Sequence, residues 1–340
     1  MSTSLGWGLA LVVLGGFLNG SFAAPMKKMP AWRWENTWLL YSLVGMVIVP
    51  VILGIATVPH LGGVYFAASW PTLFKVALFG FGWGVGSTLL GLGIERVGMA
   101  LGFAIILGVT ASVGSLLPLL VLSPGALWTR RGYALLAGLA LVVLGVLFSS
   151  IAGGRREREL SGKSQAETRR GFGTGLLICL FAGVFSAMLN FSFVFGKELQ
   201  QLSLAAGARA AMAANSIWVL ALGAGFLANA GYCVYLLRRN HTWHTFKADQ
   251  VSAAYWLRAL LMGVIWFSGI AVYGMGGSAL GPLGGVVGWP VFMAMVIIAA
   301  NLWGALTGEW KGASRGSYTY ASMGIAVLLG AIYVISLGGA

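Results

Sequence analysis

The chain has 340 residues, of which 59% are hydrophobic and only 9% are charged. Soluble domains carry about 25% charged residues, so this composition excludes a water-soluble domain for most of the chain and predicts a membrane protein. The net charge of +13 does not indicate nucleic-acid binding, because basic residues at the ends of membrane spans are what the positive-inside rule produces.

Apolar segments follow one another along the chain, separated by short polar stretches. Each has about 20 to 26 residues, enough to cross a hydrocarbon core of about 30 Å at about 1.5 Å per helical residue. Lipid offers the backbone no hydrogen-bond partners, so we predict helices. The fold class is an all-α membrane protein with ten transmembrane helices. The predicted spans are residues 5–26, 36–58, 73–94, 97–121, 133–152, 173–195, 211–237, 253–276, 282–307 and 318–338.

The distribution of lysine and arginine predicts the orientation of the chain. With the N-terminus outside, sixteen of the 21 basic residues fall in cytoplasmic loops and span ends. The other five are Lys75, Arg130, Arg131, Lys197 and Arg209. This bias predicts that both termini lie outside the cell.

A charged stretch divides the chain into two groups of five spans. We predict a first half at 1–152, a cytoplasmic connector at 153–170 and a second half at 171–340. Five is an odd number, so the halves would be inverted relative to each other, as in inverted-repeat transporters. Weak internal similarity supports this: Gly16 aligns with Gly183, and Trp83 in GWGVGSTLLGLG aligns with Trp266 in IWFSGIAVYGMG.

Several segments resemble the L-rhamnose–proton symporter family of the drug/metabolite transporter superfamily. They are FAAPMKKMPAWRWENTW, FGFGWGVGSTLLGLGIERVGMALGFAIILG, GLLICLFAGVFSAMLNFSF and GEWKG. The resemblance extends over essentially the whole chain. It implies inverted five-helix halves, alternating access, and import of a deoxy sugar with a proton across the inner membrane of a bacterium. It also implies that spans 1, 3, 4, 6, 8 and 9 form the site while spans 5 and 10 pack peripherally. An acidic residue is implied where this chain has Gly285.

A sugar site needs groups that pair with hydroxyls and aromatic faces that stack on the ring. Polar groups inside membrane spans are costly, so those present are candidates for function. The alternative for an amide is an interhelical hydrogen bond, and for an aromatic ring it is core packing. The predicted substrate contacts are Asn19, Ser21, Trp83, Ser186, Asn190, Trp266, Tyr273, Trp289 and Asn301.

No carboxylate or histidine lies at the centre of a predicted span, so a proton carrier would have to lie at a span end. Glu35, close to Lys27, Lys28 and Arg33, is the first candidate. Lys27 and Lys28 would then gate the cytoplasmic mouth against Glu35. The alternatives are a surface ion pair at a helix start for Glu35 and topology anchors for the two lysines. Coupling to a metal cation, or to no ion, stays open.

Three other functions compete with sugar import. A metabolite exporter of the same superfamily would need a different cavity chemistry. A membrane enzyme would need a catalytic constellation, and His241, His244 and Asp249 in one basic loop give only a weak metal signal. A channel would show a ring of charge or a filter-like repeat. We therefore expect a transporter and no enzyme, with a small sugar and the lipid bilayer as partners. We expect no cofactor, and a proton gradient as the energy source. The sequence does not indicate an oligomeric state.

Overall fold

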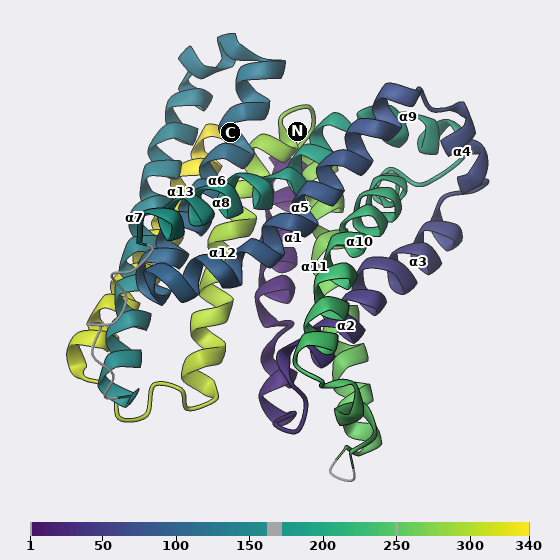
Figure 1. Ribbon diagram of the computed structural model, residues 1–340. Helices are drawn as coiled ribbons and strands as arrows, with labels where there is room; N and C mark the ends of the chain where they lie inside the picture. The colour runs from purple at the N-terminus through teal and green to yellow at the C-terminus, as the bar shows by residue number, and fades with distance from the viewer. Residues whose placement is uncertain (1, 162–171, 249–250, 340) are drawn as a thin grey trace.

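The structure of the protein, a computed structural model, describes residues 2–161, 172–248 and 251–339 (Figure 1). No β-strand occurs in these residues. The α-helices are α1 (Ser2–Ser21), α2 (Trp34–Leu43), α3 (Val49–Thr57), α4 (Leu61–Ala67), α5 (Trp70–Val97), α6 (Met99–Leu122), α7 (Arg130–Ser161), α8 (Phe172–Phe195), α9 (Lys197–Ala205), α10 (Asn215–Arg239), α11 (Ala253–Ala279), α12 (Gly284–Leu306) and α13 (Arg315–Gly339). Short 3-10 turns occupy Ala24–Lys28, Pro124–Trp128 and Trp243–Lys247.

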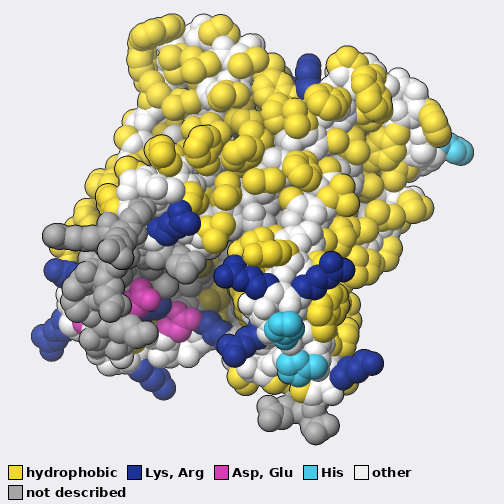
Figure 2. Space-filling model, in the orientation of Figure 1, with side chains coloured by type: hydrophobic (Ala, Val, Ile, Leu, Met, Phe, Trp, Pro, Cys, Tyr) yellow, Lys and Arg dark blue, Asp and Glu magenta, His cyan; other side chains and the backbone are white. Residues whose placement is uncertain are grey.

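The predicted all-α membrane fold is confirmed. In the described part of the chain, ten helical segments are long and apolar enough to cross a membrane, and each overlaps one of the predicted spans. Hydrophobic side chains cover much of the face shown in Figure 2, as its yellow side chains show. The apolar residues that fill each span therefore serve both lipid contact and helix packing.

The second span is the irregular one. It consists of α2, one π-helical turn at Val44–Ile48, and α3. Pro50 stands at the start of α3, and a proline has no backbone N–H to donate to the preceding turn. Gly45, in the π-helical turn, lies against Gly263 of α11: a Cβ on Gly45 would be 2.9 Å from the Gly263 carbonyl oxygen. The backbone N–H that Pro50 lacks and the close approach of Gly45 to Gly263 together explain the wider, π-helical turn at Val44–Ile48.

The first part of the predicted connector is helical. Helix α7 continues beyond the apolar segment to Ser161, because the sequence RRERELS is rich in residues that favour helix. Residues 162–171 lie outside the described residues, as does Asp249.

Charged side chains are concentrated at one end of the helices. Figure 2 shows most of the visible lysine and arginine side chains at its lower end, whereas both termini lie at the upper end in Figure 1. Two termini at one end follow from an even number of spans. Which end faces the cytoplasm stays a prediction from the positive-inside rule.

Helix packing pairs the first half of the chain with the second. Helix α1 packs against α11 and α12, and α8 packs against α5 and α6. Helix α7 packs along α13, and α5 also packs against α10. The main hydrophobic core lies between these pairs and includes Trp218, Phe267 and Tyr273, all almost fully buried.

Candidate functional site

A cavity of about 580 Å³ lies between the two groups of helices. Its size falls within the usual range for small-molecule pockets, roughly 300–1,000 Å³. One end of the cavity, near the middle of the helices, is bounded by Thr110 and Trp289. The other end reaches Arg156, Glu309 and Trp310, beyond the ends of the apolar segments. The cavity therefore extends from the centre of the protein toward its charged end.

The predicted helices line this cavity, but two others contribute as well. Residues of α1, α5, α6, α8, α11 and α12 line it, and they belong to spans 1, 3, 4, 6, 8 and 9. Trp38 of α2 and several residues of α7, Val146 to Arg156, line it too. The prediction that span 5 is peripheral is therefore wrong: α7 lies with one side against α13 and with another on the cavity.

Two tryptophans at matching positions of the two halves meet in the cavity wall. The rings of Trp83 from α5 and Trp266 from α11 stack with their centroids 5.5 Å apart and an angle of 25° between their planes. Both line the cavity. A flat aromatic surface of this kind fits the C–H face of a sugar ring, as it fits other apolar faces.

Polar groups in the wall come mainly from amides and hydroxyls. Asn19 donates to the backbone carbonyl of Trp266 at 3.4 Å, and its Oδ1 accepts no hydrogen bond from the described residues. Asn301 donates to the carbonyl of Ile297 at 2.9 Å. Ser186 also lines the cavity. Trp289 donates to the carbonyl of Thr110 at 3.0 Å, so its indole N–H is already used. These groups leave acceptors on Asn19 and Asn301 for the hydroxyls of a ligand.

Three of the predicted contact residues lie outside the cavity wall. Ser21 is buried, donates to the carbonyl of Phe17 and accepts from the indole of Trp303. Asn190 and Tyr273 are fully buried and hydrogen-bonded to each other. In this conformation the amide and hydroxyls of these residues make hydrogen bonds within the protein. Such bonds were the alternative to substrate contact for intramembrane polar groups.

Glu35 also lies away from the cavity. It is 4% exposed, and its carboxylate accepts hydrogen bonds from Asn240 at 3.0 Å and from Thr242 at 2.8 Å. The expected pairing of Glu35 with the lysines is therefore wrong for this conformation. The hydrogen bonds of Glu35 connect the start of α2 to the turn after α10. Lys28 is exposed at the protein surface.

Lys27 instead pairs with Glu309, a residue that sequence reasoning missed. The Glu309 carboxylate contacts the Lys27 ammonium and the Arg156 guanidinium, the latter at 2.8 Å. Burial alone would raise the pKa of the Glu309 carboxyl, but the hydrogen bonds and charges of Lys27 and Arg156 hold that pKa below its ordinary value. The GEWKG motif after span 9 contains Glu309, yet the local sequence gives no sign of partners so distant along the chain.

Asn229 of α10 is a second residue that is absent from the predicted contacts. Its Oδ1 accepts from the indole N–H of Trp38 at 3.3 Å and from the hydroxyl of Ser87 at 3.1 Å. Both donors line the cavity, whereas Asn229 is fully buried behind them. This amide therefore fixes the orientation of two groups in the cavity wall.

The weak metal signal in the basic loop gains no support from the structure. His244 Nδ1 lies 2.8 Å from the carbonyl oxygen of His241, whose backbone has a positive φ of 53°. Within the described ranges, no three His, Cys, Asp or Glu side chains are grouped so as to hold a metal ion.

Comparison with known proteins agrees with the residue-level resemblance. Curated relatives called L-rhamnose-proton symporter include those of Cronobacter sakazakii, 29% identical, Klebsiella pneumoniae, 28% identical, and Salmonella typhi, 27% identical. Each alignment covers 99% of this chain and 99% of the relative. The profile of the L-rhamnose-proton symport protein family (RhaT) matches residues 1–340. The chain therefore belongs to the L-rhamnose-proton symport protein family.

Proposed function

We propose that this protein imports L-rhamnose, or a closely related small sugar, together with a proton. The observation that carries this proposal is the family match over the whole chain. The cavity is consistent with it, because the stacked Trp83–Trp266 pair offers an aromatic face and Asn19 offers a free acceptor. We place the sugar ring against the two tryptophans, with a hydroxyl donating to Asn19 Oδ1.

Transport would follow alternating access between two inverted five-helix halves. The packing supports such halves: the first span of each half lies against the third and fourth spans of the other, that is, α1 on α11 and α12, and α8 on α5 and α6. The aligned glycines occupy equivalent contacts. A Cβ on Gly16 would lie 2.7 Å from the carbonyl oxygen of Phe292 in α12, and one on Gly183 would lie 3.0 Å from that of Ile106 in α6.

The described conformation corresponds to an inward-open state in this proposal. The cavity reaches the end of the protein where Lys27, Arg156 and Glu309 lie, and the positive-inside rule assigns that end to the cytoplasm. The N- and C-termini would then lie outside, and the membrane would be the inner membrane of a bacterium.

The carboxylate best placed to respond to protons is Glu309. Among the described residues it is the carboxylate that lines the cavity, whereas Glu35 is held by Asn240 and Thr242 away from it. Glu309 also joins Lys27, in the 3-10 turn after α1, to Arg156 on α7. Its protonation would remove the charge that holds these two cations together. Glu309 therefore replaces Glu35 as our first candidate for the proton acceptor.

Binding of L-rhamnose to the purified protein tests the substrate directly. Trp83 and Trp266 lie in the proposed site, so tryptophan fluorescence should change on titration with L-rhamnose and not with D-glucose. Asn19→Ala should weaken binding about tenfold, since it removes a hydrogen bond made in a partly buried site. Asn215→Ala is the matched control, because Asn215 donates to Thr57 outside the cavity. No L-rhamnose response in folded protein, or equal weakening by both variants, would contradict the proposal.

A further inference from the structure

A second pocket lies at the opposite end of the protein from the mouth of the central cavity. It encloses about 300 Å³ and is lined by the ends of α8, α9, α11 and α12 together with the segment before α10. Its wall includes Val194, Lys197, Gln200, Ala210, Ser278 and Gly285. These helix ends lie in the upper part of Figure 1. We call this pocket the vestibule.

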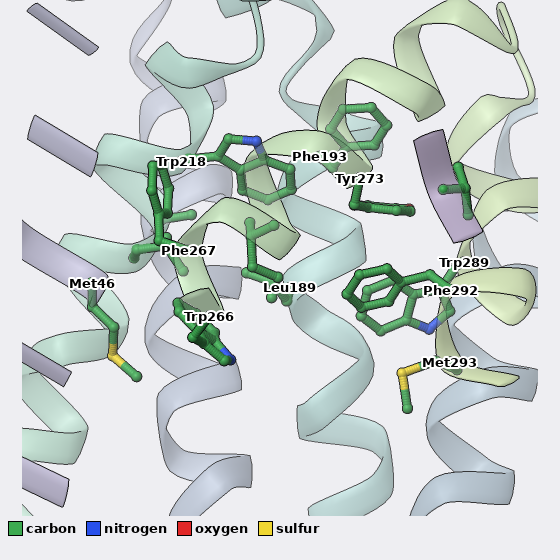
Figure 3. Close-up of a cluster of buried hydrophobic side chains, with 14 of the residues drawn as sticks. Met46, Leu189, Phe193, Trp218, Trp266, Phe267, Tyr273, Trp289, Phe292 and Met293 are labelled. Atoms are coloured by element: carbon green, nitrogen blue, oxygen red, sulfur yellow. The ribbon is translucent and has the colours of Figure 1, made fainter. Parts of the chain in front are cut away.

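A layer of buried side chains separates the vestibule from the central cavity. It consists of Asn190, Phe193, Trp218 and Tyr273, each between 0 and 5% exposed, and we call it the septum. Phe193 and Trp218 stack with ring centroids 5.5 Å apart, and Tyr273 lies 5.5 Å from Phe193. Figure 3 shows Phe193, Trp218 and Tyr273 above the cavity-lining Trp289.

The septum lies between the vestibule and the central cavity. Phe193 lines the vestibule, and Trp289, whose ring centroid lies 5.7 Å from that of Tyr273, lines the cavity. A Cβ on Gly285, in the wall of the vestibule, would lie 2.5 Å from Val194 and 3.4 Å from Asn190 Oδ1. Helices α8 and α12 are thus in close contact at the septum, so the septum closes one compartment off from the other.

Hydrogen bonds to Asn190 hold this layer together. Its Nδ2 donates to the carbonyl oxygens of Gly114 and Gly285, both at 2.9 Å, and its Oδ1 accepts from the Tyr273 hydroxyl at 2.5 Å. Both amide hydrogens are therefore used, and the group has no donor left for a ligand. Gly114 belongs to α6 in the first half of the chain, whereas Asn190, Tyr273 and Gly285 belong to the second half. The bond to Gly114 therefore joins the two halves.

Such a polar connection can open at moderate cost. After separation, the Asn190 amide, the Tyr273 hydroxyl and the Gly114 carbonyl would form hydrogen bonds with water or with the hydroxyls of a sugar. Amides and hydroxyls can exchange one hydrogen-bond partner for another in this way. A bond that joins two halves which move against each other is the kind of contact that alternates in hinge-type closure. We propose that the vestibule is the outer entrance of the transport pathway and that the Asn190–Tyr273–Gly114 connection is its closure. This proposal rests on the proposed function for the identity of the passing molecule.

Accessibility of single cysteines tests the closure without any sugar. Cys179 and Cys233 are free and buried, and replacing both by alanine gives the background. In that background, Ala300→Cys places a thiol in the central cavity and Ala210→Cys places one in the vestibule. A membrane-impermeant maleimide is applied to sealed membrane vesicles of either orientation. The labelling of Ala210→Cys identifies the face on which the vestibule opens.

From the vestibule face, Ala300→Cys should react slowly when the septum is intact. Tyr273→Phe removes one hydrogen bond and keeps the ring, so we expect labelling of Ala300→Cys from that face to rise about fivefold. Asn190→Ala removes all three hydrogen bonds and should raise it by more than about tenfold. The matched control is Tyr65→Phe, since the Tyr65 hydroxyl donates to the carbonyl of Ser216 outside the septum, and it should change nothing.

Two results would overturn the proposal. One is unchanged labelling of Ala300→Cys from the vestibule face in both septum variants, in protein that elutes as a folded species. The other is an equal increase in Tyr65→Phe, which would indicate general loosening. Failure of L-rhamnose to bind would overturn the proposed substrate and leave this labelling result intact, so the two proposals fail separately.

Discussion

Close contact between α5 and α10 holds one tryptophan of the proposed sugar site in place, and a single methyl group should disturb it. A Cβ on Gly84 of α5 would lie 2.3 Å from the carbonyl oxygen of Gly225 in α10. Ordinary van der Waals contact begins near 3.4 Å, so the two helices must separate by about 1 Å to admit it. Trp83 lies beside this contact: a Cβ on Gly225 would be 3.0 Å from its ring.

The expected size of the effect follows from two opposing terms. Overpacking of this kind costs about 1–3 kcal/mol, whereas alanine gains about 0.5–1 kcal/mol over glycine inside a helix. Gly84→Ala should therefore destabilise the protein by about 1 kcal/mol, within a range of about 0–2.5 kcal/mol, and weaken L-rhamnose binding through the displaced Trp83. Gly91→Ala is the matched control on the same helix, because no atom lies within 4 Å of its Cβ position.

Thermal unfolding of the purified proteins in detergent measures the difference. The Tm of Gly84→Ala should fall below that of the parent, and the Tm of Gly91→Ala should equal or exceed the parent value. Both variants share the propensity gain, so their difference reports the packing term alone. Equal Tm values for the two variants would refute the close approach of α5 and α10.

Two further predictions concern the cavity wall and its charged mouth. Trp266→Leu removes one ring of the stacked pair and should weaken L-rhamnose binding at least about fivefold. The control is Trp70→Leu, at a position 75% exposed, which should leave the affinity measured by fluorescence unchanged. Equal weakening by both variants would contradict the placement of the sugar. The lowered pKa of Glu309 means that its pairing with Lys27 stabilises the folded protein at neutral pH and is lost as the pH falls through that pKa. Between neutral and acidic pH, the Tm of Glu309→Gln should therefore decrease by less than the Tm of the parent. Equal decreases in Tm for the two proteins would show that the Glu309–Lys27 pair does not contribute to stability.

The sequence was sufficient for properties that depend on local composition. Ten apolar segments gave the spans, and the matching contexts of Trp83 and Trp266 indicated two rings in the same site, which the structure places in contact. The first signal lies within single segments, and the second needs only a comparison of two segments along the chain. The hydrophobic length of a span and the repeated pattern around a tryptophan need no knowledge of the tertiary packing.

Pairings between distant segments were not accessible in the same way. Glu35 stands close to Lys27 along the chain, which suggested an ion pair, but Lys27 reaches Glu309 and Glu35 reaches Asn240 instead. The sequence predicts a substrate contact for the intramembrane amide Asn190, yet the packing shows that both its donors bond to backbone carbonyls. Residue type tells which groups need partners, and the tertiary structure decides which partners they find.

Uptake of radiolabelled L-rhamnose into proteoliposomes addresses proton-coupled sugar import itself. With an inward proton gradient imposed, the sugar should accumulate inside above its external concentration, and a protonophore or the omission of protein should abolish the accumulation. L-Rhamnose that only equilibrates across the membrane, with no response to the gradient, would contradict proton coupling. No movement of L-rhamnose by protein shown to be folded would contradict the proposed substrate.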